Sequence, residues 1–137
     1  MFHIIRPALV VAMAIGLIAG CSTLNLRDRM QDFEDTSRAY GRAIAWSEYD
    51  VAAAFLKTGD QDQSASEIDY LNQFKVTDYE PRLGSVLEKD VRIRQVVSIS
   101  YFRKDNLVVR TISDDQLWEY DANKKSWVLT TGFPKFK

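Results

Sequence analysis

The chain has 137 residues, of which 46% are hydrophobic and 27% charged, and its formal net charge is -1. These values are typical of one globular domain and give no electrostatic footprint for nucleic-acid binding. The only cysteine, Cys21, and the only histidine, His3, both lie near the N-terminus, which argues against an internal disulfide, a transition-metal site or a histidine-dependent catalytic unit. We therefore expect no metal and no cofactor.

The first residues have the order of a secretion signal. Arg6 is their only charge, and a continuous apolar run of eleven residues, 8–18, follows it. A helix of that length rises about 16 Å, roughly half the hydrocarbon core of a bilayer. The run is therefore typical of the apolar core of a signal peptide and too short for a comfortable membrane span.

An aliphatic residue, two small residues and the single cysteine follow as Ile18-Ala19-Gly20-Cys21. This segment resembles the lipobox of bacterial lipoproteins, with Ile18 where leucine is commonest. The resemblance implies that residues 1–20 are cleaved as a signal peptide and that Cys21 is acylated, so that acyl chains hold the protein on a membrane. Ser22 favours the outer membrane facing the periplasm in a Gram-negative host. An ordinary secretory signal, or a cytosolic protein with an apolar N-terminus, is the alternative.

The mature chain divides into a polar lipidated tether, 21–29, and a single domain, 30–137, that is long enough to bury one core. Helical spacing of apolar residues begins at Met30 and breaks near Ser47. A second helix is expected over 48–57, with a capping box at Ser47–Asp50 and a stop at Gly59. A second capping-box pattern predicts a short third helix over 64–72.

From Phe74 onward the pattern alternates as in half-buried strands. The first strand is expected over 74–79, with Pro81 and Gly84 marking a bulge, an edge or an interruption. The longest strand, 91–103, has one apolar face and one mixed face. Further strands are expected over 107–112, 116–120 and 126–131, with a break at 113–115 and tight turns at 104–106 and 121–125.

Consecutive strands joined by short turns predict an antiparallel meander of four to five strands. The helices come first and pack on one face, which makes an α+β domain with a curved sheet. This order, together with the segments 45–56 and 118–129, resembles small NTF2-like or cystatin-like bacterial lipoproteins. A BamE-like or plain cystatin-like helix-on-sheet fold is the alternative.

Two interpretations are open for the aromatic residues near the expected helix–sheet interface. They fill the core, or they line a pocket for a small apolar ligand. Gln95 favours a pocket, because a polar side chain on an apolar strand face needs a buried partner or a cavity. The candidate pocket residues are Trp46, Tyr49, Gln95, Trp118 and Trp127.

The NTF2-like resemblance also implies an alternative function, in which an aspartate beside a tyrosine performs acid–base chemistry inside an apolar cone. The candidate carboxylates are Asp50, Asp69 and Asp78, with Tyr40, Tyr49, Tyr70 and Tyr101 as partners. The acidic segment 113–116 lacks the pattern of a calcium loop and is interpreted as a hairpin turn. The basic residues Arg92, Arg94 and Arg110 either meet an anionic ligand or form solvated ion pairs.

These observations predict a membrane-anchored periplasmic lipoprotein whose domain is a non-enzymatic binding or scaffolding module. Its partner is an envelope protein or a small apolar ligand, and a homodimer that pairs through the open sheet face is a third hypothesis. The alternative is an NTF2-like enzyme of the isomerase or dehydratase type. Nucleic acid is not expected as a partner, and no catalytic residue is assigned.

Overall fold

The computed structural model describes residues 20–57, 61–88 and 91–137. The signal peptide, the first half of the lipobox and Gly59 lie outside the described residues. The elements are α1 (Gly20–Ala45), α2 (Tyr49–Ala53), α3 (Gln61–Leu71), β1 (Phe74–Glu88), β2 (Arg92–Arg103), β3 (Val109–Asp121) and β4 (Ser126–Leu129). Within these ranges, no helix has the length and apolar character needed to cross a bilayer.

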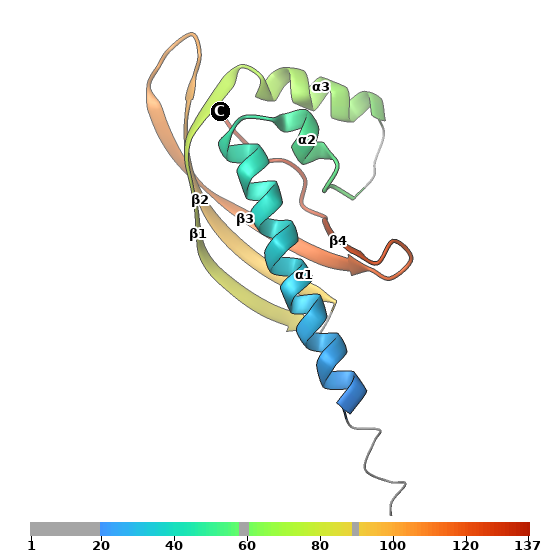
Figure 1. Cartoon of the computed structure of the whole chain (residues 1–137). Helices are drawn as coiled ribbons and strands as arrows, with labels where there is room; N and C mark the ends of the chain where they lie inside the picture. The colour runs from blue at the N-terminus through green and yellow to red at the C-terminus, as the bar shows by residue number, and fades with distance from the viewer. Residues whose placement is uncertain (1–19, 58–60, 89–90) are drawn as a thin grey trace, which may run out of the picture.

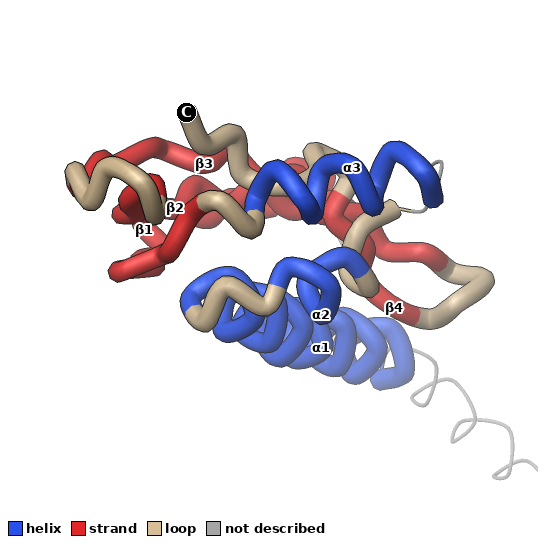
Figure 2. The backbone as a smooth tube through the Cα atoms, turned by 90° about the horizontal axis from the view of Figure 1, so that it is seen from above, coloured by secondary structure: helices blue, strands red, loops and turns tan. Residues whose placement is uncertain are grey.

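The sheet is an antiparallel meander with the strand order β1-β2-β3-β4. It curls around α1, which runs across its concave face, while α2 and α3 lie at one end (Figure 1). The view from above shows α1 and α2 next to each other on one side of the sheet (Figure 2). The predicted α+β fold with helices on a curved meander is confirmed.

The first helix is longer than the sequence pattern predicts, because residues 22–29 are helical and not a tether. This segment contains neither glycine nor proline, so nothing in it interrupts the helix that follows. Contacts with the sheet also hold it. The Arg29 guanidinium lies 4.5 Å from the centre of the Tyr120 ring, and the Arg29 carbonyl accepts a 2.9 Å hydrogen bond from Trp127 Nε1.

The predicted break near Ser47 is confirmed, but both predicted capping boxes are wrong. Ser47 adopts a left-handed backbone with φ of 56°, and its hydroxyl accepts a hydrogen bond from the Val76 amide. It therefore ties the helical turn to β1 and does not cap α2, whose N-cap is Glu48 without a side-chain hydrogen bond. The third helix already begins at Gln61, three positions before the expected cap at Ser64.

The expected break at 113–115 is also wrong, because β3 continues through it and pairs with β2 along its length. Ser113 and Asp115 are exposed on one face, while Asp114 points to the other, more buried face. The sequence Ser-Asp-Asp favours a turn by residue type. The pairing of β3 with β2 keeps the segment extended instead. β1 is longer than predicted and passes Pro81 and Gly84 as an edge strand with bulges.

The core consists mainly of aromatic side chains between α1 and the sheet. Phe33 and Tyr40 of α1 make edge-to-face contacts with Trp118 at ring-centre distances of 6.1 and 5.5 Å. A second cluster, at the other end, joins Phe74, Tyr101 and the C-terminal Phe136. Such pairs add about 0.5–1.5 kcal/mol each to the free energy gained by burial.

Candidate functional site

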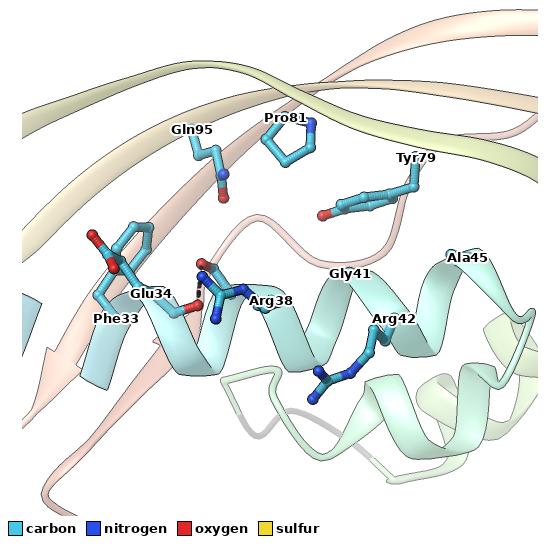
Figure 3. Close-up of a pocket in the computed structure, with 10 residues that line it drawn as sticks. Phe33, Glu34, Arg38, Gly41, Arg42, Ala45, Tyr79, Pro81 and Gln95 are labelled. Carbon is cyan, nitrogen blue, oxygen red and sulfur yellow. Dashed lines mark hydrogen bonds between the residues drawn. The ribbon is translucent and has the colours of Figure 1, made fainter. Parts of the chain in front are cut away.

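A groove of about 430 Å³ lies between α1 and the sheet (Figure 3). Its helical wall begins at Phe33 and ends at Ala45, and its sheet wall comes from β1 and β2. The full lining is Phe33, Glu34, Ser37, Arg38, Gly41, Arg42, Ala45, Tyr79, Pro81 and Gln95. The groove therefore has apolar surface inside, and charged side chains come only from the helix.

Gly41 shapes the groove, because its missing side chain leaves room for the ring of Tyr79. A Cβ atom at position 41 would lie 2.7 Å from Tyr79 Cε1, which is closer than real contacts allow. The ring of Tyr79 therefore rests directly on the helix, and its hydroxyl points along the groove (Figure 3). Burial raises the pKa of Tyr79 to about 12, so the phenol is protonated at neutral pH.

Gln95 supplies an acceptor to the groove that nothing in the described chain satisfies. Its side chain extends from β2 toward the helix, and its Oε1 atom is buried without a hydrogen-bond partner (Figure 3). An unsatisfied buried polar atom costs about 1–3 kcal/mol of stability. Such a cost in a native fold needs a reason, and a bound group that donates a hydrogen bond is one.

A polar network lies next to Tyr79 and is centred on Gln116, the one polar residue that is fully buried among those whose burial the structure describes. Gln116 Nε2 donates to Tyr79 Oη at 3.0 Å and to Asp114 Oδ2 at 2.9 Å. Its Oε1 accepts from Trp118 Nε1 at 3.1 Å. Gln116 thus uses both of its amide hydrogens, and Tyr79 accepts a hydrogen bond while keeping its own hydroxyl hydrogen for another partner.

Asp114 belongs to this network, and the ring of Tyr40 lies close to it without joining its hydrogen bonds. Burial raises the pKa of Asp114; Asp115 raises it further, while the Gln116 hydrogen bond and Lys135 act against the shift. Tyr40 is fully buried, and its hydroxyl has no hydrogen-bond partner in the described chain. Its pKa is raised by burial and then by the charges of Asp114 and Tyr79. The arrangement places a carboxyl near two phenols in a poorly hydrated environment.

Replacing Asp114 with asparagine is expected to change how stability depends on pH. Both states of the parent chain bind the proton below the ordinary pKa of 3.8. As the pH rises from there to the raised pKa of the folded state, the unfolded chain ionises first, so the parent loses stability. Asparagine cannot ionise and still accepts from Gln116. The stability of Asp114→Asn relative to the parent should therefore increase between pH 3 and neutral pH.

Urea unfolding at a series of pH values measures this difference. Asp115→Asn is the control with the opposite sign, because the hydrogen bond from Arg94 lowers the pKa of the exposed Asp115. A constant difference between Asp114→Asn and the parent from pH 3 to 7 would contradict the assignment of Asp114 as a carboxyl with a raised pKa.

Of the five pocket residues predicted from the sequence, only Gln95 lines the groove. Trp118 and Trp127 are core residues, and so is Tyr49, whose hydroxyl donates to the Phe74 carbonyl at 3.0 Å. Trp46 lies in the turn after α1 and is 72% exposed, so its assignment to a pocket is wrong. Cys21 falls in the first turn of α1, and its side chain lies outside the description.

The three carboxylates proposed for acid–base chemistry, Asp50, Asp69 and Asp78, are all exposed. The carboxyl that the fold encloses is Asp114, which the sequence interpretation assigned to a turn. The sequence does contain a signal for the burial of Asp114. If residues 109–121 form one continuous strand, Asp114 lies on the same inward face as residues 112, 116, 118 and 120.

Arg92 and Arg94 are paired with acidic side chains and form no joint anion site with Arg110. Arg94 binds Asp115 with Nε–Oδ1 at 2.7 Å, Arg92 lies 3.5 Å from Glu119, and Arg110 donates to the Lys137 main-chain oxygen. The interpretation of these residues as solvated pairs therefore holds for Arg92 and Arg94. Among residues 20–57, 61–88 and 91–137, no group of three histidine, cysteine or acidic side chains could hold a metal ion.

Comparison with known proteins gives no family. No family model matches the chain, and no curated protein matches it in sequence. A SEC-C motif containing protein from Rhodopseudomonas palustris has a similar structure, with a TM-score of 0.52 and 11% identity over 69% of this chain and 72% of that chain. A putative polyketide cyclase from Xanthomonas campestris pv. campestris has a TM-score of 0.50 and 12% identity, over 74% of this chain and 91% of that chain.

At these identities the likeness concerns the fold alone. The two likenesses agree with the α+β fold and curled antiparallel sheet described above. The chain is therefore an α+β protein with a curled antiparallel sheet and a groove beneath its longest helix.

Proposed function

We propose that this chain is a lipid-anchored binding protein whose groove holds a small, largely apolar ligand. The observation that carries the proposal is the buried Gln95 Oε1 atom, which lacks a partner and faces the groove. Beside it, Tyr79 contributes a hydroxyl hydrogen that no described acceptor takes up. One acceptor and one donor beside apolar surface are typical of small-molecule sites.

The ligand that fits these groups has an apolar body and a polar end that both donates and accepts, such as a protonated carboxylic acid, an amide or an alcohol. Its donor would satisfy Gln95, and its acceptor would receive the Tyr79 hydroxyl hydrogen. Tyr79 stays protonated because burial raises its pKa to about 12. Phe33 and Pro81 offer the apolar surface along which the body of the ligand would lie.

Replacing Gln95 with leucine is expected to stabilise the ligand-free chain and to abolish binding. Leucine has a similar volume and removes the unsatisfied acceptor, so the free energy of unfolding should increase by about 1 kcal/mol or more. The same change removes the acceptor that the ligand needs. Thermal unfolding gives the stability, and native mass spectrometry of the chain purified from its own cells shows the ligand that remains bound.

Gln31→Leu is the matched control, because Gln31 is exposed on α1, does not line the groove, and only makes a 3.4 Å contact with Asp35. It should change neither the ligand content nor the stability by more than about 0.5 kcal/mol. A bound molecule retained equally by Gln95→Leu and the parent, or a Gln95→Leu chain that is less stable than the parent, would refute this use of Gln95.

The membrane attachment belongs to the same proposal and is supported by the lipobox pattern ending at Cys21. Acyl chains on Cys21 would hold the domain on a membrane of the cell envelope, on the outer membrane facing the periplasm in a Gram-negative host. Cells grown with labelled palmitate should incorporate the label into the parent and not into Cys21→Ser. Label in both the parent and Cys21→Ser would mean that a residue other than Cys21 is acylated. Label in neither chain would contradict the lipid anchor.

An acid–base enzyme is the second candidate, and the enclosed Asp114 favours it. Asp114 and Tyr79 both contact Gln116, and burial raises the pKa of each. A carboxyl whose pKa is raised by burial, lying beside a phenol, is the type of pair that performs acid–base chemistry in enclosed active sites. A ligand recovered from the parent chain and converted by it, but not by Asp114→Asn, would replace the binding protein with this enzyme.

A further inference from the structure

Three consecutive exposed aliphatic residues follow the turn of the hairpin between β2 and β3. Leu107 is 69% exposed, Val108 53% and Val109 60%. Isolated exposed aliphatic residues are ordinary, but a contiguous group at a protruding tip marks an interaction site. The hairpin projects at the end of the sheet away from the start of α1 (Figure 1). We call Leu107, Val108 and Val109 the aliphatic tip.

The backbone conformation at the aliphatic tip is unfavourable for the leucine at position 107. Leu107 has φ of 57°, in the left-handed region that costs a residue with a Cβ about 1–2 kcal/mol. Glycine or asparagine would fit this position better, and Asn106 stands directly before it. A strained residue that is also exposed contributes little to packing, so the strain points to a function of the tip outside the fold.

Basic side chains surround the aliphatic tip. Arg103, Arg110 and Lys137 line a recess of about 100 Å³ together with Val108, and Lys104 lies in the turn itself. The acidic counterpart is Asp105, which forms a 3.0 Å ion pair with Arg103. Arg110 donates to the Lys137 main-chain oxygen. Asp105 offsets the charge of Arg103, and the terminal carboxylate of Lys137, which accepts from Arg110, offsets one further cation. The four basic side chains therefore still give the surroundings of the tip a positive balance.

We propose that the aliphatic tip docks onto an anionic phospholipid surface. Leu107, Val108 and Val109 would enter the boundary between headgroups and acyl chains, and the basic side chains would meet lipid phosphates. Apolar insertion combined with electrostatic attraction is the usual physics of reversible membrane docking. Three small side chains are too few for a stable protein pair, which buries roughly 1,200 Å² or more, so a second copy or a folded partner fits less well. The docking uses neither the groove nor Cys21.

Two tryptophan reporters in the full-length chain test the position of the tip on the membrane. Val109→Trp places the reporter at the tip, and Val86→Trp is the matched control, an exposed valine (50%) in β1. Each is mixed with vesicles of brominated phosphatidylcholine, with or without brominated phosphatidylglycerol, and the unsubstituted chain supplies the background of native tryptophans. We expect a blue shift and quenching for Val109→Trp only with phosphatidylglycerol, and neither for Val86→Trp.

Two further changes in the Val109→Trp chain separate apolar insertion from charge. Leu107→Asn relieves the left-handed strain, so the fold should remain at least as stable, while the vesicle affinity should fall several-fold. Lys104→Glu should lower the affinity about five-fold or more, since each basic residue contributes about 1 kcal/mol near an anionic surface.

Three results would overturn the docking proposal. Equal quenching of both reporters would mean that the N-terminal segment brings the whole chain to the vesicle. Equal quenching with and without phosphatidylglycerol would remove the role of charge. A dimer seen by light scattering without vesicles, and abolished by Leu107→Asn, would assign the aliphatic tip to a second copy of the chain. Each result leaves the groove proposal untouched, because Gln95 takes no part in it.

Discussion

Trp118→Ala is expected to lower the free energy of unfolding by about 3–5 kcal/mol, a large part of the stability of a domain of this size. Trp118 is fully buried and makes edge-to-face contacts with Phe33 and Tyr40. Its indole nitrogen also donates to Gln116, so the truncation leaves a buried oxygen without a partner as well as a cavity. Urea unfolding followed by circular dichroism measures the loss.

Trp46→Ala is the matched control for this prediction. The same truncation at a side chain that is 72% exposed should change stability by no more than about 0.5 kcal/mol. Trp118→Phe should fall between the two, because phenylalanine keeps the aromatic contacts but cannot donate to Gln116. Similar losses at positions 46 and 118 would contradict the burial that defines the core between α1 and the sheet.

Gly41→Val is expected to destabilise the chain by about 1–3 kcal/mol and to close the groove. Valine should be better than glycine in an unconstrained helix, so intrinsic propensity favours the opposite sign. The clash decides the sign here, since a Cβ at position 41 would lie 2.7 Å from the ring of Tyr79. The ring must move into the groove or away from Gln116, and either movement removes the ligand site.

Gly84→Val provides the comparison in the sheet. Its Cβ would meet nothing nearer than the Arg94 carbonyl oxygen at 3.9 Å, an ordinary contact, and the residue lies in the exposed edge strand. Stability should therefore stay within about 0.5 kcal/mol of the parent, and any bound ligand should be retained. If Gly41→Val stabilised the chain instead, helix propensity would outweigh the contact with Tyr79, and the described groove wall would be wrong.

Most of the fold could be predicted from the sequence because its apolar residues recur at regular helix-like and strand-like intervals. The core face of β2, with Ile93, Val97 and Ile99 buried, follows directly from alternation along the strand. Local signals failed where tertiary contacts override them. Ser113-Asp114-Asp115 favours a turn by residue type, yet pairing with β2 keeps it extended. The segment 22–29 was too polar to suggest a docked helix, but contacts of Arg29 with β3 and β4 hold its end.

The groove itself depends on contacts between residues far apart in the chain, which periodicity does not report. Gly41 is an ordinary helical glycine in the sequence, and only the packing of α1 against β1 places the ring of Tyr79 over it. Gln95 was identified because a polar residue interrupts an apolar face, and this signal needs no knowledge of its neighbours. Asp114 was missed because its orientation depends on whether the strand is continuous. A site residue that interrupts a regular apolar pattern can thus be recognised from the sequence. A site residue whose role depends on contacts with distant parts of the chain cannot.

Because α1 is one continuous helix, the distance and the rotation of the groove relative to the first residues of the helix are fixed. The helix runs from Gly20 through the groove wall, and its first turns project beyond the end of the sheet (Figure 1). Between Cys21 and Phe33 it rises about 18 Å, so an anchor at Cys21 would act through a stiff lever. One residue inserted at its beginning would lift the groove by about 1.5 Å and turn its opening by about 100° around the helix axis. The number of residues in the helix would then set the direction in which the groove faces. Only an insertion that adds whole helical turns would restore the original direction.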